Sequence, residues 1–439
     1  MSVVLKFMIN NLKIATNIIS RFLYVGIAFL VTIKIARDVN LETAGQVFVF
    51  MSLVQFLSCF FRQGLDKVVV KQVASLSGRD PKFLIKLYNE ILYKVLRVSV
   101  TLAVITTLLF CLVIATKSQI EISIVEPSTI ALLMVGAYCI FFNSVLTING
   151  HFLQGLNFQH LANFYINGSV NIPFLLGLLL LSCNNVTEFA LVYCLANFFA
   201  FSISILSVIK KCSFTKCQLV SILFPLKVPQ SSAVDRDYKY MWYTSMIGQF
   251  VTHVPVILCS LFFGSGNAAL LRIAQRVATL INIALNAINA YASVRLAYAF
   301  KNKSKQFVRK TFFQYSRLAW VTLLPLLVGL YLFLDEILLA FGSDYKAANE
   351  MTKVLLAAQF FNIITSCSGT FMIMKGQYRL VFVCALISVL ASIISGILMV
   401  DFLLVTSVVL SCAIFTILQN TIFSFYCLKD LNSFNQKVG

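Results

Sequence analysis

Long runs of apolar side chains recur along the whole chain and constrain its fold more than any other feature. Of its 439 residues, 59% are hydrophobic and 12% are charged, whereas soluble domains carry about 25% charged residues. A helix needs about 20 apolar residues to cross a hydrocarbon core about 30 Å thick. The sequence therefore predicts an all-α, polytopic membrane protein of about twelve spans. We place them near residues 12–35, 44–63, 92–115, 129–150, 160–181, 188–209, 241–262, 268–294, 316–334, 352–372, 380–400 and 404–427.

The 12 cysteines stand singly and mostly inside apolar segments. No CxxC spacing occurs, so the sequence indicates neither a zinc site nor a disulfide framework. We expect no metal and no cofactor, and we expect the thiols to behave as small hydrophobic side chains.

Successive predicted loops alternate between many and few basic residues, and this pattern explains the net charge of +19 without a nucleic-acid partner. One set, which includes both chain ends, carries 25 Lys and Arg residues, and the other carries five. The positive-inside rule places the richer set, with both termini, in the cytoplasm. Membrane orientation accounts for this charge, although the basic loops could also bind anionic lipids.

An internal repeat divides the chain into halves. Residues 141–180 align without a gap on residues 360–399, a shift of 219 positions with ten identities in forty. An even number of spans per repeat gives both halves the same orientation, as in transporters with parallel repeats. We expect two parallel six-helix lobes, residues 1–210 and 241–439, around a central cavity, joined by a cytoplasmic linker at 211–240. No outer loop is large enough for a catalytic domain, so transport is expected rather than enzymatic chemistry.

Ionisable residues inside spans are costly and serve as candidates for function. Arg21 and Arg276 lie near the predicted midplane, with Arg272 one turn from Arg276, and Arg62 lies near a cytoplasmic helix end. The alternative is that these long side chains reach the interface. With no Asp or Glu near the middle of any span, a cavity lined by arginines would take an anion. His253 could titrate during coupling or could be an ordinary core residue.

Amide side chains form a polar stripe along the eighth predicted span. Its members share one helix face with the arginines and are Gln275, Asn282, Asn286 and Asn289. Asn143 and Asn163, in spans four and five, suggest a second polar lining. Such groups suit sugar hydroxyls, although hydrogen bonds between helices would explain them equally.

Several ordered pieces of sequence resemble one transporter family. They are Gly45 at the start of span two, Gly64-Leu65 before a basic loop, the stretch LLRIAQRVATLINIALNAINA, Phe341-Gly342 with Tyr345, Gly369, and Gly376 with Arg379. Together they resemble the polysaccharide flippases of the multidrug/oligosaccharidyl-lipid/polysaccharide exporter superfamily. In the related lipid II flippases, arginines of spans one, two and eight line the cavity, and Arg21, Arg62, Arg272 and Arg276 occupy comparable spans here.

The resemblance implies a flippase of the bacterial inner membrane that moves an undecaprenyl-diphosphate-linked oligosaccharide outward. Its expected partners are membrane lipids, with polysaccharide polymerase and chain-length proteins as further candidates. A multidrug or metabolite antiporter of the same fold remains open, as does a membrane polymerase or ligase. The antiporter would need a cation-binding group, for which only His253 is available. The polymerase or ligase would usually carry a large outer loop, which this sequence lacks.

Overall fold

The computed structural model describes residues 3–62, 64–76, 127–212, 236–302 and 305–433, together with part of the stretch 84–108. Within these residues the chain is helical with short turns, and they contain no strand. Eight helices are long and apolar enough to cross a membrane, or up to ten if each of two bent helix pairs is one span. These findings confirm the predicted all-α membrane fold.

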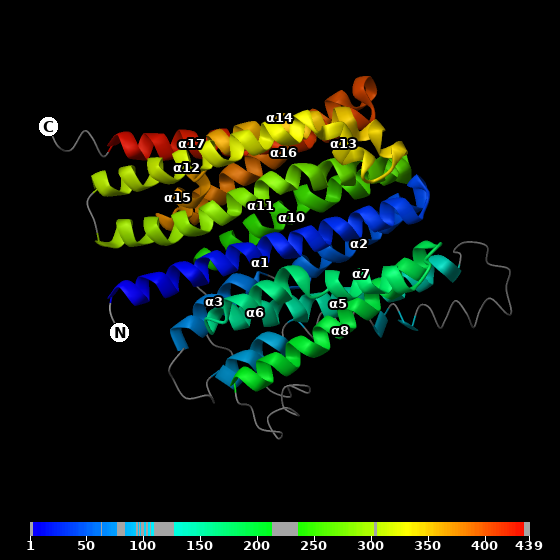
Figure 1. Cartoon of the computed structure of the whole chain (residues 1–439), viewed down its shortest axis with the longest axis horizontal. Helices are drawn as coiled ribbons and strands as arrows, with labels where there is room; N and C mark the ends of the chain where they lie inside the picture. Colours follow the sequence, from blue (N-terminus) through cyan, green and yellow to red (C-terminus); the bar gives the residue numbers. More distant parts are fainter. Residues whose placement is uncertain are drawn as a thin grey trace. The chain divides into compact units, whose positions relative to one another are not determined.

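The contacts divide the chain into two compact units, each described by itself here. Unit 1 contains Met1–Val39 and Phe50–Tyr238, and unit 2 contains Asn40–Val49 and Lys239–Gly439. The helices are labelled in Figure 1. Up to residue 212 they are α1 (Val3–Asp38), α2 (Leu41–Arg62), α3 (Leu65–Leu76), α5 (Pro127–Gly155), α6 (Gln159–Asn163), the π-helical η1 (Phe164–Gly168), α7 (Asn171–Leu180) and α8 (Val186–Cys212). From residue 236 they are α10 (Arg236–Phe263), α11 (Ser265–Asn302), α12 (Lys305–Leu332), α13 (Leu334–Leu339), the 3-10 helix η2 (Ser343–Ala348), α14 (Asn349–Ile364), α15 (Ser368–Met374), α16 (Tyr378–Leu403) and α17 (Val405–Ser433).

Every predicted span except 92–115 falls on one of these helices or on a bent helix pair, but several helices are longer than the predicted span. For example, α1 begins at Val3 rather than near residue 12, α12 begins at Lys305 rather than near residue 316, and α11 ends at Asn302 rather than near residue 294. Most of the span at 92–115 lies outside the described residues. One helix was not predicted. Residues 65–76, read from the sequence as part of a basic loop, form α3, which buries Leu65, Val69 and Val73 in the core of unit 1. That core also holds Tyr88, Phe152 and Tyr165.

A tight corner joins α5 to α6 in unit 1. The backbone N–H of Phe158 donates to the carbonyl of Leu153 at 2.9 Å, and that of Asn157 donates to Gln154 at 3.0 Å. Asn157 has a φ of 69°, in the left-handed region. Together these features make a Schellman motif, which satisfies carbonyls that the end of a helix leaves without partners.

The same corner joins α15 to α16 in unit 2, at positions shifted by 219. The N–H of Gln377 donates to Met372 at 3.0 Å, that of Gly376 donates to Ile373 at 3.0 Å, and Gly376 has a φ of 85°. Each of the two hydrogen bonds at the corner of unit 1 therefore has a counterpart at the corner of unit 2. The structure confirms that the repeat seen in the sequence is a repeat of backbone geometry.

The two repeats bend at different places. In unit 2 the bend lies in the first helix of the pair, where α14 gives way to α15 at 49° across the left-handed Cys367. In unit 1, α5 runs straight and the bend of 45° lies in the second helix, between η1 and α7. Asn167 and Asn171 donate side-chain N–H groups to the carbonyls of Asn163 and Asn167 in this irregular stretch, at 3.3 and 2.9 Å.

We expect Gly376→Ala to lower the free energy of unfolding by about 1 kcal/mol, because a left-handed conformation costs an L-residue roughly that much. A Cβ at this position would meet no other atom within 4 Å, so the cost lies in the backbone alone. The measurement is denaturant or thermal unfolding of the purified protein in detergent. Gly329→Ala, inside α12 and equally free of neighbours, is the control and should be neutral or stabilising. Equal stability of the two variants would contradict this account of the corner.

Candidate functional site

The polar residues of α11 form two adjacent rows within the stripe that the sequence predicts. Residues seven apart lie on nearly the same face of an α-helix. Gln275, Asn282 and Asn289 make up one row, and Arg272, Thr279 and Asn286 make up the other. The two rows have different surroundings, although both belong to the broad face that the sequence predicts.

The first row faces neighbouring helices of unit 2. Asn362 of α14 donates its side-chain N–H to Asn282 at 2.7 Å and to Gln359 at 2.9 Å. The side chain of Gln275 lies within hydrogen-bonding reach of the Cys412 thiol on α17. This row therefore includes hydrogen bonds between helices, the alternative that the sequence left open.

The second row carries the positive charge. Arg272 is half-buried and acts electrostatically on Arg276, one turn further along α11, and on His253 of α10. His253 is 4% exposed, whereas Asn286 is exposed. Two guanidinium groups and an imidazole are thus collected between α10 and α11. Neither helix contains Asp or Glu after Asp237.

Besides Trp242 Nε1 in the first turns of α10, four buried polar atoms on these two helices have no hydrogen-bond partner among the described residues. They are His253 Nδ1, Gln275 Oε1, Arg276 Nε and Asn289 Oδ1. Buried polar atoms are nearly always paired, with protein or with water, and in hydrocarbon an unpaired one is especially costly. The cluster around Arg276 is therefore suited to hold water or a ligand, and its charge favours an anion.

The candidate arginines of unit 1 have other surroundings. Arg62 ends α2, and its Nε donates to both carboxylate oxygens of Asp66 at 3.2 Å, with 9% of the Arg62 side chain exposed. Arg62 is thus a neutralised member of an ion pair. Arg21 lies within α1, and its side chain lies outside the described residues.

The amides of unit 1 also bond to other protein groups. Asn143 of α5 donates to Asn197 of α8 at 3.3 Å. Asn163 is 3% exposed, at the junction of α6 and η1. A π-helical turn of this kind often occurs at functional sites, but the amides themselves act mainly as links within unit 1.

Two buried polar features of unit 1 were missed by the sequence reasoning. Tyr88 donates to Asn149 at 2.8 Å, and Asn149 donates to Ser204 at 2.8 Å, which links three segments through buried groups. Glu90, 8% exposed, is a buried carboxylate. Both Tyr88 and Glu90 were assigned to a basic connection, and their helix begins earlier than its apolar stretch suggests.

Comparison with known proteins identifies the family. The model of the family described as "Polysaccharide biosynthesis protein" matches residues 13–295, more than half of the chain. The chain belongs to this family. No curated protein sequence matches it.

Solved structures show the same fold at low sequence identity. An inward-facing multidrug resistance MATE transporter of the MOP superfamily aligns with a TM-score of 0.67 and 14% identity, over 96% of this chain and all of that one. The lipid II flippase MurJ, in an inward closed conformation, aligns with a TM-score of 0.64 and 16% identity over 96% and 90% of the two chains. A MOP superfamily transporter from Pyrococcus furiosus, titled as having a binding pocket of reverse polarity, gives 0.59 and 11% over 96% of each chain. This likeness shows that the chain shares the fold of these transporters.

We expect Asp66→Ala to destabilise the protein by at least about 2 kcal/mol, because it leaves the nearly buried Arg62 without a counter-charge. Arg62→Ala combined with Asp66→Ala should recover part of this loss. The free energy of unfolding of both single variants and the double variant measures the coupling. Strictly additive effects would show that the pair contributes nothing.

We expect the amide pair Asn282 and Asn362 to couple by about 0.6 kcal/mol, as is usual for hydrogen bonds between membrane helices. A double-mutant cycle with Asn282→Leu and Asn362→Leu measures it. Asn286→Leu, on the same helix but exposed, is the matched control and should leave the stability unchanged. A coupling of zero would show that the bond does not tie α11 to α14.

Proposed function

We propose that this protein is a flippase that moves an undecaprenyl-diphosphate-linked oligosaccharide, an O-antigen or capsule repeat unit, from the cytoplasmic to the periplasmic leaflet by alternating access. The observation that carries the proposal is the cluster of Arg272, Arg276 and His253. In it, His253 Nδ1 and Arg276 Nε are buried without a hydrogen-bond partner among the described residues, and neither α10 nor α11 contains Asp or Glu after Asp237. Family membership supports a role in polysaccharide synthesis.

A diphosphate fits this cluster by its chemistry. It carries several negative charges and acceptor oxygens, whereas Arg276 offers a buried N–H donor without a partner and guanidinium groups bind phosphate oxygens in pairs. Arginine keeps its charge in surroundings where lysine or histidine readily loses a proton. We assign diphosphate binding to Arg272 and Arg276, with Asn286 toward the glycan, and we retain Arg21 as a candidate contributor from unit 1.

The proposal includes the arrangement predicted from the sequence. Lobes at 1–210 and 241–439, joined by the linker at 211–240, would rock about the cavity, with both termini in the cytoplasm and the protein in the bacterial inner membrane. The charge asymmetry of the loops supports this orientation. The predicted lobes divide the chain close to residue 238, where the compact units divide.

A multidrug or metabolite antiporter is the second candidate, because the fold is shared with MATE transporters. The buried Glu90 of unit 1, together with His253, gives such a protein groups that could bind a coupling cation. The two functions differ in what a deletion strain accumulates. A flippase mutant should accumulate lipid-linked repeat units on the inner leaflet, whereas an antiporter mutant should become sensitive to its drug with normal surface polysaccharide.

We expect Arg276→Ala to abolish surface polysaccharide while the protein level stays normal, since the diphosphate loses its buried donor. Arg276→Lys should retain part of the export, because it keeps the charge but loses the planar set of donors. Arg295→Ala, an exposed position on the same helix, is the control and should export normally. The readouts are surface polysaccharide and inner-leaflet lipid-linked repeat units. Normal export by Arg276→Ala would reject this cluster as the substrate site.

A further inference from the structure

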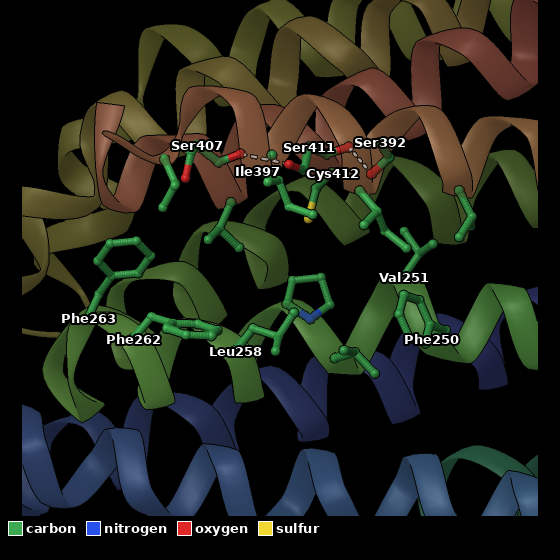
Figure 2. A pocket seen from close by; sticks show the side chains of 17 residues that line it. Phe250, Val251, Leu258, Phe262, Phe263, Ser392, Ile397, Ser407, Ser411 and Cys412 are labelled. Atoms are coloured by element: carbon green, nitrogen blue, oxygen red, sulfur yellow. Dashed lines mark hydrogen bonds between the residues drawn. The ribbon is translucent and has the colours of Figure 1, made fainter. Parts of the chain in front are cut away.

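An apolar pocket of about 350 Å³ lies between α10, α16 and α17, within unit 2 (Figure 2). Phe250, Leu258 and Phe262 line it from α10, Ile393 and Ile397 from α16, and Cys412 from α17. Its volume falls in the range of small-molecule sites, about 300–1,000 Å³. The pocket is therefore large enough to hold a segment of a ligand.

The wall of this pocket is apolar even where serines form it. Ser392 donates its hydroxyl to the carbonyl of Ser411 at 2.8 Å, and Ser411 donates to Ser407 at 2.8 Å. Ser407 in turn donates to the carbonyl of Leu404 at 2.5 Å. No charged residue lines the pocket. Because each of these hydroxyls gives its proton to the backbone, the surface suits hydrocarbon and offers little to a polar ligand.

Unit 1 has larger side chains at two equivalent positions. With the shift of 219, Ile393 corresponds to Phe174 and Cys412 corresponds to Tyr193. Phe174 and Tyr193 are both buried, and their rings meet edge to face with centroids 5.1 Å apart. Two aromatic rings thus stand in unit 1 where unit 2 has an isoleucine and a cysteine. The smaller side chains of unit 2 contribute to the opening of its pocket.

Helix α10 is sparsely covered on this side. Only 17% of its most apolar stretch is buried, compared with 61% for α11. Protein interiors are normally close-packed, so a span that stands apart from α16 and α17 leaves room for something other than this chain. In a membrane that occupant is a hydrocarbon chain.

The pocket comes near the cationic cluster through α17. Cys412 lines the pocket, and its thiol lies close to the side chain of Gln275, which precedes Arg276 on α11. His253 lies on a different face of α10 from the lining residues Val254 and Leu258, since successive helical residues are about 100° apart. Leu258 and Arg272 lie six and eight residues from the turn at Gly264, which puts both at a depth of about 9–12 Å from that end. One ligand with an anionic head and a hydrocarbon tail could therefore reach both places.

We propose that this pocket binds the polyprenyl tail of the lipid-linked anion whose diphosphate is held by Arg272 and Arg276, an inference that rests on the proposed function. Lipid surroundings are as apolar as the pocket, so the gain comes from close van der Waals fit rather than from leaving water. The pocket thus selects a long tail next to the diphosphate, and it distinguishes the substrate from a short-chain or tail-free diphosphate.

The test fills the pocket with a larger side chain. Leu258→Trp projects into it, and Leu261→Trp is the matched control, on the same helix and exposed but outside the lining. Binding of undecaprenyl diphosphate, farnesyl diphosphate and inorganic pyrophosphate is measured on the full-length protein in detergent. We expect Leu258→Trp to weaken the binding of undecaprenyl diphosphate at least about fivefold, equal to about 1 kcal/mol, and to leave the affinity for pyrophosphate unchanged. Leu261→Trp should change neither affinity.

A second pair on the opposite wall guards against a folding defect. Ile393 lines the pocket, and its neighbour Ile394 does not. Ile393→Trp should therefore weaken the binding of undecaprenyl diphosphate as Leu258→Trp does, whereas Ile394→Trp should bind it as the wild type does. Both variants should keep the thermal stability of the wild type. Unchanged undecaprenyl diphosphate affinity in both pocket variants would overturn the tail site alone. If phosphatidylglycerol displaced bound undecaprenyl diphosphate as readily as unlabelled undecaprenyl diphosphate does, the tail site would also be overturned, because the pocket would then hold bulk lipid. Failure of the wild type to bind either diphosphate lipid or pyrophosphate would overturn the proposed function.

Discussion

Hydrocarbon offers the backbone no hydrogen-bond partner, so each N–H and C=O group inside the membrane must be satisfied by the chain itself. The spans meet this demand with helices, and their ends and bends show how it is met where the helix is interrupted. The corner at Asn157 and its counterpart at Gly376 return N–H groups to the carbonyls of the preceding turn. Side chains serve the same purpose at the bend of unit 1, where Asn167 and Asn171 bond to carbonyls one turn back.

The same medium decides which charged side chains carry information about function. Arg62 is compensated by Asp66, and its position follows from local electrostatics alone. Arg276 lies near a second guanidinium, and its buried Nε–H has no partner among the described residues. Bringing like charges together in low dielectric is unfavourable unless a counter-ion joins them. Two arginines that look alike in the sequence are thus separated by their neighbours, and the uncompensated one is the stronger indicator of a ligand.

Much of the fold could be predicted from the sequence, because hydrophobic length and charge placement are properties of single segments. The repeat was also visible, and its identities at Phe152 and Gly177 recur in the structure as a fully buried ring and a close helix contact. The candidate site was less predictable. Helical spacing placed Asn282 and Arg272 on one broad face, but only the neighbouring Asn362 shows that Asn282 bonds to protein. Glu90 was missed because its helix begins in a polar stretch that resembles a loop.

The repeat keeps its corners and changes its interior, and this difference bears on how transport could be divided between the halves. Phe174 and Tyr193 fill unit 1 at positions where Ile393 and Cys412 line a pocket in unit 2. The arginine cluster lies in unit 2 as well, so both the head and the tail of the proposed substrate would be held by the same unit. A ligand held at two points by one rigid body keeps its orientation when that body rocks, as alternating access requires. Unit 1 would then contribute the candidate Arg21 and its own packing, consistent with the well-bonded interior around Tyr88 and Asn149.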